Sequence, residues 1–408
     1  MRPTINRLPG SKIREVANAG LGRADVLPFW FGESDEVTPA EVRQAAADSL
    51  LRGETFYSHN LGLAELREAL RGYTAGLHGD PGPDRIAVTS SGVTGLMIAM
   101  QLLVDAGDEV VVVVPVWPNL PAQPAILGAR VVRVALAPDA AGAWRLDLDR
   151  LLAAVTPATR VLLLNAPNNP TGWTLTRAEQ QALLDHCRRT GTWIVADEVY
   201  DRVWFGEDVS PLTPAASPPE GGSPVGGGPA RAMAAPSFLD IASPDDRLVV
   251  VNSFSKSFLM TGWRLGWLVL PSGHLEAVGK LIEFNSSCAP VFVQRGALAA
   301  LAIADTFVPQ LVARLKAGRD ALCPALAALP GVQVATPLGG LYAFFRVPGA
   351  DDSLAFAKHL VAEHGLGLAP GAAFGDEGEG WLRWCFASQD TARLAQGVER
   401  LRNALRGC

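Results

Sequence analysis

Short apolar runs alternate with helix-like segments along this chain, and that alternation constrains the fold more than any other feature. Runs with the length and composition of buried strands occur at Arg85–Thr89, Glu109–Val114, Arg130–Val134, Arg160–Asn165, Trp193–Asp197 and Leu248–Asn252. Helical spacing of apolar residues occurs at Glu41–Gly53, Leu61–Tyr73, Thr94–Val104 and Arg177–Thr190. This order favours an α/β fold in which a mostly parallel central sheet is covered by helices on both faces.

The last third of the chain has a different pattern. Helical patterns at Glu276–Glu283, Gln294–Ala304 and Pro309–Ala328 lead to expected strands near Val332–Thr336, Leu341–Val347 and Trp381–Phe386. At about 150 residues per domain, 408 residues predict two or three domains. We expect a large domain at 46–275 and a smaller α/β domain at 276–408, with residues 1–45 as an N-terminal segment of the small domain.

Residues 210–237 interrupt the alternation. This stretch contains seven prolines, five glycines and almost no large apolar residues. It cannot bury enough apolar surface to order itself, so we expect a flexible surface insertion. A functional lid is the alternative.

Composition excludes several classes of protein. Lys and Arg total 35 against 41 Asp and Glu, and no basic run stands out, which argues against partners such as nucleic acid or an anionic membrane surface. No apolar stretch approaches the ~20 residues of a membrane span, and residues 1–20 lack the apolar core of a signal peptide. The five scattered cysteines favour a reduced cytoplasm, and neither they nor the six histidines have metal-ligand spacing.

Polar motifs follow the predicted strands. They are Asn168-Asn169-Pro170-Thr171-Gly172, Asp197-Glu198-Val199-Tyr200, Ser253-Phe254-Ser255-Lys256 with Arg264 shortly after, and Ser91-Gly92-Val93-Thr94 at a helix start. Each alone has an ordinary reading as a turn, a helix cap or a solvated lysine. The carboxyl ends of parallel strands meet at one edge of a sheet, where ligands bind. We therefore expect these motifs to form one site.

Together the motifs suit pyridoxal 5′-phosphate. This cofactor needs a lysine for a Schiff base, an acid for its pyridinium nitrogen and a phosphate cradle. Lys256 would supply the imine, and Asp197 would keep the ring nitrogen protonated. Asn169 and Tyr200 would hydrogen-bond the ring phenolate oxygen.

The phosphate would be held at the start of the expected helix. Thr94, Ser253 and Arg264 would bind it, together with the backbone of Gly92 and Val93. Trp117 would stack on the ring, unless it is an ordinary core aromatic.

In combination these motifs resemble those of the class I/II aminotransferases, the fold-type I pyridoxal phosphate enzymes related to aspartate aminotransferase. The resemblance runs from about Ser11 to the C-terminus, leaving out 210–237, and includes Gly262-Trp263-Arg264-Leu265-Gly266. Weaker matches are Phe31-Gly32-Glu33-Ser34-Asp35, Tyr57 with Gly62 and Leu66-Arg67, Gly339-Gly340-Leu341-Tyr342, Pro370-Gly371-Ala372-Ala373-Phe374-Gly375 and Leu382-Arg383-Trp384-Cys385-Phe386-Ala387.

The resemblance implies further roles. Arg383 would clamp the substrate α-carboxylate, next to Asn169, and Gly32 would close over the substrate. Tyr57 would reach the phosphate of the neighbouring subunit of a homodimer, because active sites of this family form at a dimer interface. The chain departs from the family at Ser34, Gly95 and Trp117, where proline, an acidic residue and tyrosine are usual.

The resulting prediction is an aminotransferase that passes an amino group from an L-amino acid to a 2-oxo acid, with freed Lys256 as general base. The preferred donor would be neutral, or the range of donors broad, because no second cation stands beside the motifs, although Arg14 and Arg295 stay possible. A carbon–sulfur β-lyase or related elimination enzyme, a cyclopropane synthase or a decarboxylase could use the same residues. A ligand-sensing domain of a transcription regulator is the non-enzymatic alternative.

Overall fold

A seven-stranded sheet forms the centre of the protein, whose structure is a computed structural model that describes residues 1–206 and 233–406. Its order is β2-β10-β9-β8-β7-β3-β4, and neighbours are parallel except where β10 pairs antiparallel with β2 and β9. The strands are β2 (Ile86–Thr89), β3 (Glu109–Val114), β4 (Arg130–Ala135), β7 (Thr159–Asn165), β8 (Trp193–Asp197), β9 (Leu248–Ser253) and β10 (Gly266–Val269). The predicted α/β fold with a mostly parallel sheet is confirmed.

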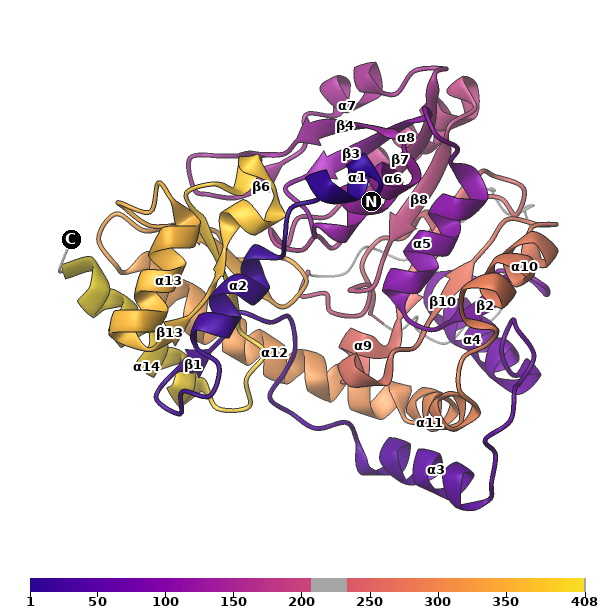
Figure 1. Cartoon of the computed structure of the whole chain (residues 1–408), viewed down its shortest axis with the longest axis horizontal. Helices are drawn as coiled ribbons and strands as arrows, with labels where there is room; N and C mark the ends of the chain where they lie inside the picture. The colour runs from indigo at the N-terminus through magenta and orange to yellow at the C-terminus, as the bar shows by residue number, and fades with distance from the viewer. Residues whose placement is uncertain (207–232, 407–408) are drawn as a thin grey trace, which may run out of the picture.

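Helices cover both faces of this sheet (Figure 1). Along β3, Val110, Val112 and Val114 pack into one buried cluster and Val111 and Val113 into the other, as expected when both faces are covered. The first cluster includes buried residues of α5 (Gly92–Leu103), α6 (Asn119–Leu127) and α10 (Leu275–Ser286). The second includes those of α4 (Ala64–His78), α7 (Leu148–Ala154) and α8 (Arg177–Thr190).

A smaller sheet is built from the C-terminal part of the chain. Its order is β11-β12-β15-β14, with antiparallel neighbours throughout. The strands are β11 (Gln333–Val334), β12 (Tyr342–Arg346), β14 (Ala369–Pro370) and β15 (Trp381–Cys385). Near it lie the helices α2 (Lys12–Ala19), α13 (Ser353–His364) and α14 (Thr391–Arg406) (Figure 1).

The N-terminal segment joins this smaller part. Strand β1 (Leu27–Pro28) pairs in parallel with β13 (Leu366–Gly367), and α2 packs on α13. The segment therefore crosses from the C-terminal sheet towards the central one. Other short elements are α1 (Pro3–Arg7), β5 (Ala137–Pro138), β6 (Trp144–Arg145) and α9 (Phe254–Ser257).

The helix α12 (Ala304–Ala327) connects the two parts (Figure 1). It packs on α14 and β11 and follows α11 (Val291–Ala302), which packs on α3 (Ala40–Leu51) and α4. Within the described chain no single helix is long and apolar enough to cross a membrane, although α11 and α12 together pass that test across an 80° bend.

Helix boundaries differ most from the sequence expectation at two places. The helix expected at Pro309–Ala328 begins five residues earlier, at Ala304, because a proline inside a helix removes one hydrogen bond but does not have to end it. The helix expected at Leu61–Tyr73 begins at Ala64 and extends to His78, and Gly79 follows with a φ of 102°.

The expected insertion at 210–237 is wrong at its C-terminal end. The backbone N–H of Ala235 donates to the carbonyl oxygen of Asp201 over 2.7 Å, and Ser237 is fully buried. The Ser237 hydroxyl donates to Glu198 Oε2 over 2.6 Å. These contacts fix the end of the segment against the end of β8. The remaining residues of the expected insertion, up to 232, lie outside the described part of the chain.

Candidate active site

A cavity of about 220 Å³ lies at the carboxyl ends of β7, β8 and β9. The predicted site residues that line it are Gly32, Gly92, Val93, Trp117, Asn169, Asp197, Tyr200, Ser253, Lys256, Arg264 and Arg383. The cavity is also lined by Leu96, Asn165, Val199, Ser255, Thr261 and Tyr342, which the sequence analysis did not select. The structure thus brings together residues from both sheets and from the N-terminal segment.

Lys256 lies on the short helix α9, directly after β9. The Ser253 hydroxyl caps this helix by accepting from the backbone N–H of Ser255 over 3.1 Å. The Lys256 ammonium donates to the carbonyl oxygen of Gly32 over 2.6 Å and lies 5.6 Å from the ring centre of Tyr200. Burial lowers the pKa of Lys256 to about 8. A lysine with this pKa is a usable base near neutral pH, whereas an exposed lysine is almost fully protonated.

Asp197 is the last residue of β8 and is 5% exposed. Among the described residues its carboxylate has no ion pair, and its Oδ1 accepts only a long 3.4 Å hydrogen bond from the backbone N–H of Val199. Burial raises the pKa of Asp197 to about 7. A buried carboxylate without a cationic partner is costly, so it favours a ligand that brings a positive charge or a proton.

Asn165 holds two of the neighbouring segments together. Its side-chain amide donates to the carbonyl oxygen of Asp197 over 3.1 Å and accepts from the backbone N–H of Asn169 over 2.8 Å. Asn165 is 2% exposed and ends β7 beside Asp197 in the sheet. It therefore links the Asn169 loop to the strand that carries Asp197.

The N-terminus of α5 forms an anion cradle. Gly92 packs closely there, since a Cβ on it would lie 3.2 Å from Ser253 Cβ. Ser253 Oγ lies 2.9 Å from Ser255 Oγ, and Arg264 lines the same side without an ion pair among the described residues. Free helix N–H groups, hydroxyls and a guanidinium are the groups that bind a phosphate.

Two predicted residues do not line the cavity. The Thr94 hydroxyl lies 3.0 Å from Ser91 Oγ, at the cap of α5. Tyr57 is 88% exposed and lies on the surface. Within one chain, Tyr57 therefore makes no part of the site.

Arg383 approaches the cavity from β15. It is 1% exposed, and it donates to Asn169 Oδ1 over 2.9 Å and to the carbonyl oxygen of Trp30 over 2.5 Å. Its Nε is buried without a partner, and no carboxylate pairs with it among the described residues. A buried guanidinium that bonds only neutral oxygens can bind a ligand carboxylate in bidentate geometry.

This donor set fits pyridoxal phosphate. An unpaired buried carboxylate matches a protonated ring nitrogen, a lysine with lowered pKa matches imine formation, and the cradle matches the phosphate. Three groups that sequence analysis did not select complete the set. Ser255 stood in the Ser-x-Ser-Lys motif and Tyr342 in Gly-Gly-Leu-Tyr, so both had a signal, whereas Asn165 had only its place at a strand end.

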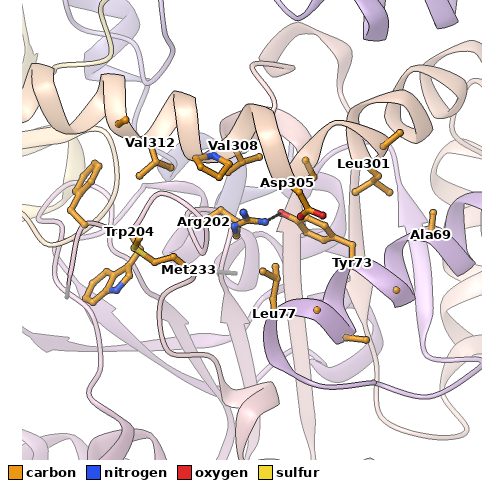
Figure 2. Close-up of a pocket in the computed structure, with 18 of the residues that line it drawn as sticks. Ala69, Tyr73, Leu77, Arg202, Trp204, Met233, Leu301, Asp305, Val308 and Val312 are labelled. Atoms are coloured by element: carbon orange, nitrogen blue, oxygen red, sulfur yellow. Dashed lines mark hydrogen bonds between the residues drawn. The ribbon is translucent and has the colours of Figure 1, made fainter. Parts of the chain in front are cut away.

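A second, larger hollow of about 1750 Å³ lies between α4, α11 and α12. Figure 2 shows Arg202 hydrogen-bonded to Tyr73 in it, over 3.3 Å, with Asp305 close by. Its walls are mostly apolar, and Gly206 and Met233, on either side of 207–232, belong to them. This hollow shares no lining residue with the smaller cavity, so it contains none of the predicted site residues.

Comparison with known proteins gives consistent matches over nearly the whole chain. The family model for aminotransferases of class I and II matches residues 25–401. An arginine–pyruvate transaminase of Pseudomonas aeruginosa is 33% identical over 96% of this chain and 91% of its own length. An aspartate aminotransferase of Pyrococcus horikoshii is 29% identical over 97% of this chain and 95% of its own. The solved structure of an aspartate aminotransferase from Thermotoga maritima covers both chains completely, with a TM-score of 0.86 and 29% identity.

Replacing Asp197 by Asn should stabilise the protein when no cofactor is bound, and the gain should grow with pH. The pKa of Asp197 is about 7 in the folded chain against an ordinary value of 3.8, so the folded state keeps a proton that the unfolded state releases. The free energy of unfolding of the wild-type protein therefore falls by about 1.4 kcal/mol for each pH unit between about pH 4 and about pH 7. Unfolding temperatures of both cofactor-free proteins across this range measure the gain.

The same substitution at Asp84, whose side chain is exposed, is the control for removing a carboxylate that is not buried. A gain for Asp197→Asn that does not change with pH would contradict the assignment of a destabilising buried carboxylate.

Proposed function

The chain belongs to the family of class I and II aminotransferases, and from that membership we propose a role for each residue of its cavity. It is a pyridoxal phosphate-dependent enzyme that transfers an amino group from an amino acid to a 2-oxo acid. These roles rest on one observation. A single cavity is lined by an unpaired buried carboxylate, by a lysine of lowered pKa and by two arginines: Asp197, Lys256, Arg264 and Arg383.

The cofactor would be held at five places. Lys256 would bond its aldehyde carbon, and Asp197 would pair with its ring nitrogen. Asn169 and Tyr200 would hydrogen-bond its ring oxygen, with Trp117 against the ring face. The cradle of Ser253, Arg264 and the first N–H groups of α5, at Gly92 and Val93, would bind its phosphate, whereas the N–H of Thr94 already donates to the Ser91 hydroxyl over 3.0 Å.

The bound cofactor supplies an electron-accepting ring that weakens the bonds at the substrate Cα. Arg383 orients the substrate by binding its α-carboxylate, next to Asn169 and Gly32. The amine of Lys256 would act as the general base that takes the proton from Cα of the substrate, and in its protonated form it would serve as the general acid. Asp197 would favour a protonated ring nitrogen, because its carboxylate has no cationic partner among the described residues.

Lys256→Ala should abolish turnover and leave the fold intact, because the Lys256 ammonium makes no ion pair with another described residue and its partners are the Gly32 carbonyl and the Tyr200 ring. Borohydride reduction of the wild type, followed by peptide mapping, should find the cofactor on Lys256. Lys280→Ala is the matched control, since Lys280 lies on the surface with its side chain 68% exposed, and it should keep full activity. A label on any other lysine would refute the assignment.

We propose that the preferred amino donor has a neutral side chain, or that the range of donors is broad. The basic residues that line the cavity are Lys256, Arg264 and Arg383, and each already has a role. Arg295 pairs with Glu54 and Glu65, so it is not available. Arg14 lies 5.9 Å from the ring centre of Phe31, outside the lining residues. A second substrate carboxylate would be desolvated without a partner in this chain.

Leucine, phenylalanine, methionine and alanine should therefore be better donors than aspartate. The measurement is kcat/KM for each donor with one oxo acid held constant. A preference for aspartate of tenfold or more, equal to about 1.4 kcal/mol, would mean that a cationic group reaches the substrate side chain.

We also propose a homodimer with shared active sites. Several large apolar side chains of neighbouring segments are exposed: Leu51 at 85%, Phe56 at 84%, Tyr57 at 88% and Phe284 at 88%. The Tyr57 segment lies beside α11, because the Gln294 amide donates to Ser58 Oγ over 3.2 Å. Large apolar side chains that are this exposed are typical of an interface. In a dimer, Tyr57 would reach the phosphate cradle of the other subunit.

Tyr57→Phe should weaken cofactor retention about tenfold, the effect of losing one hydrogen bond to a charged group. Binding of the substrate α-carboxylate should not change, because that role is proposed for Arg383, which stays in place. Dialysis against buffer without cofactor, followed by absorbance, measures retention. A fully active monomer on a sizing column would contradict the shared site.

Two further parts of the proposal concern organisation and setting. We keep the division into 1–45, 46–275 and 276–408, and the pairing of β1 with β13 supports the first of these segments as part of the small domain. We also propose a cytoplasmic enzyme without nucleic acid or membrane partners, on its charge and cysteine usage.

The β-lyase alternative is not favoured, because the relatives are named as transaminases or aminotransferases. Release of pyruvate and ammonia without an added oxo acid would support it again.

A further inference from the structure

Tyr342 connects the C-terminal sheet to the cofactor side of the cavity. It begins β12, is 1% exposed and lines the cavity. Its hydroxyl lies 2.7 Å from the hydroxyl of Tyr200, and the two rings meet edge to face with centres 5.9 Å apart. A tyrosine of one sheet therefore contacts directly the tyrosine that follows β8 of the other.

The ring of Tyr342 also supports Arg383. The guanidinium carbon of Arg383 lies 4.2 Å from the ring centre of Tyr342 and 4.9 Å from that of Phe374. Both aromatic rings are buried, so the cation–π attraction acts out of water, where it is strongest. Tyr342 and Arg383 stand on the paired strands β12 and β15, which fixes their separation.

The hydroxyl of Tyr342 has one hydrogen-bond partner among the described residues, Tyr200. If Tyr342 donates this bond, the hydroxyl hydrogen of Tyr200 stays free to point into the cavity. Gly32 packs against the same hydroxyl so closely that a Cβ on Gly32 would collide with it. The Tyr342 hydroxyl therefore has little freedom to turn elsewhere.

We propose that Tyr342 is a positioning residue that acts on two groups at once, on Tyr200 through its hydroxyl and on Arg383 through its ring. The proposal rests on the roles of Tyr200 and Arg383 given above. Donation from Tyr342 makes Tyr200 a stronger donor to the ring oxygen of the cofactor, because linked hydrogen bonds polarise one another. The stacked ring keeps the guanidinium in the plane in which it meets the substrate carboxylate.

Other ionisable groups face this pair and must be held constant in any test. They are Arg383, Asp197, Lys256, Glu33 and Cys385. The test therefore changes one hydroxyl at a time and leaves every charge in place.

The first experiment titrates the absorption of the bound cofactor with pH in the holoenzyme. Tyr342→Phe removes only the hydroxyl, so Tyr200 should become a weaker donor to the ring oxygen of the cofactor. More negative charge would then stay on that oxygen and hold the proton on the nitrogen that joins Lys256 to the cofactor. The pH midpoint should therefore move upward. The shift should be smaller than that of Tyr200→Phe. In the double variant the midpoint should equal that of Tyr200→Phe alone, since Tyr342 acts through Tyr200.

The second experiment separates the ring from the hydroxyl. Tyr342→Phe keeps the ring, so KM for leucine should stay within about twofold of wild type, whereas Tyr342→Leu removes the ring and should raise KM about fivefold, as expected for a lost cation–π contact. Thermal unfolding of both variants checks that each is folded.

Three outcomes are decisive against the inference. An unchanged midpoint in Tyr342→Phe while Tyr200→Phe moves it would overturn the hydroxyl role and leave the proposed function standing. An equal shift from Tyr342→Phe in the presence and absence of the Tyr200 hydroxyl would show that it acts by another route. An unchanged midpoint in Tyr200→Phe itself would remove the role proposed for Tyr200, and this inference with it.

Discussion

The carboxylate of Asp197 is the constraint on which the rest of the site depends. It is buried at the carboxyl edge of the central sheet with no cationic partner among the described residues, and its pKa is raised to about 7. An unpaired acid at this place lowers the stability of the protein, because a buried carboxylate loses its hydration without gaining a cationic partner. Selection for stability alone would not keep it. Its presence is understandable when the enzyme binds a cofactor whose ring nitrogen completes the pair. Asn169 and Lys256, which follow the neighbouring strands β7 and β9, line the same cavity as Asp197.

The second half of the site comes from the other sheet. Arg383 and Tyr342, on paired strands of the C-terminal sheet, meet Asn169 and Tyr200, which follow strands of the central sheet. Gly32, from the N-terminal segment, accepts from Lys256 and packs on Tyr342. Two side-chain hydrogen bonds, together with the backbone of Gly32, therefore join the groups proposed to hold the cofactor to those proposed to hold the substrate. A change in the position of either sheet would shift both Lys256 and Arg383. This gives a physical reason for coupling substrate binding to Lys256, the proposed base.

The central fold was predictable because its strands are buried on both faces and read as continuous apolar runs. Glu109–Val114, Trp193–Asp197 and Arg177–Thr190 have the boundaries expected from the sequence. The meeting of the strand-end motifs in one cavity was predictable, because parallel strands bring their carboxyl ends together. Long-range contacts were not: Tyr342 meets Tyr200 across 142 positions, and no local pattern encodes that pairing. The burial of Ala235–Ser237 was missed for the same reason, since it depends on Glu198 and Asp201.

The central claim is that Asp197 holds a proton on the ring nitrogen of the bound cofactor. The most direct measurement is the nitrogen-15 NMR spectrum of the enzyme reconstituted with pyridoxal phosphate labelled at that nitrogen. The account predicts the chemical shift of a protonated pyridine nitrogen throughout the pH range in which the enzyme is active, and loss of that signal in Asp197→Asn. The shift of an unprotonated nitrogen in the active wild-type enzyme would contradict it.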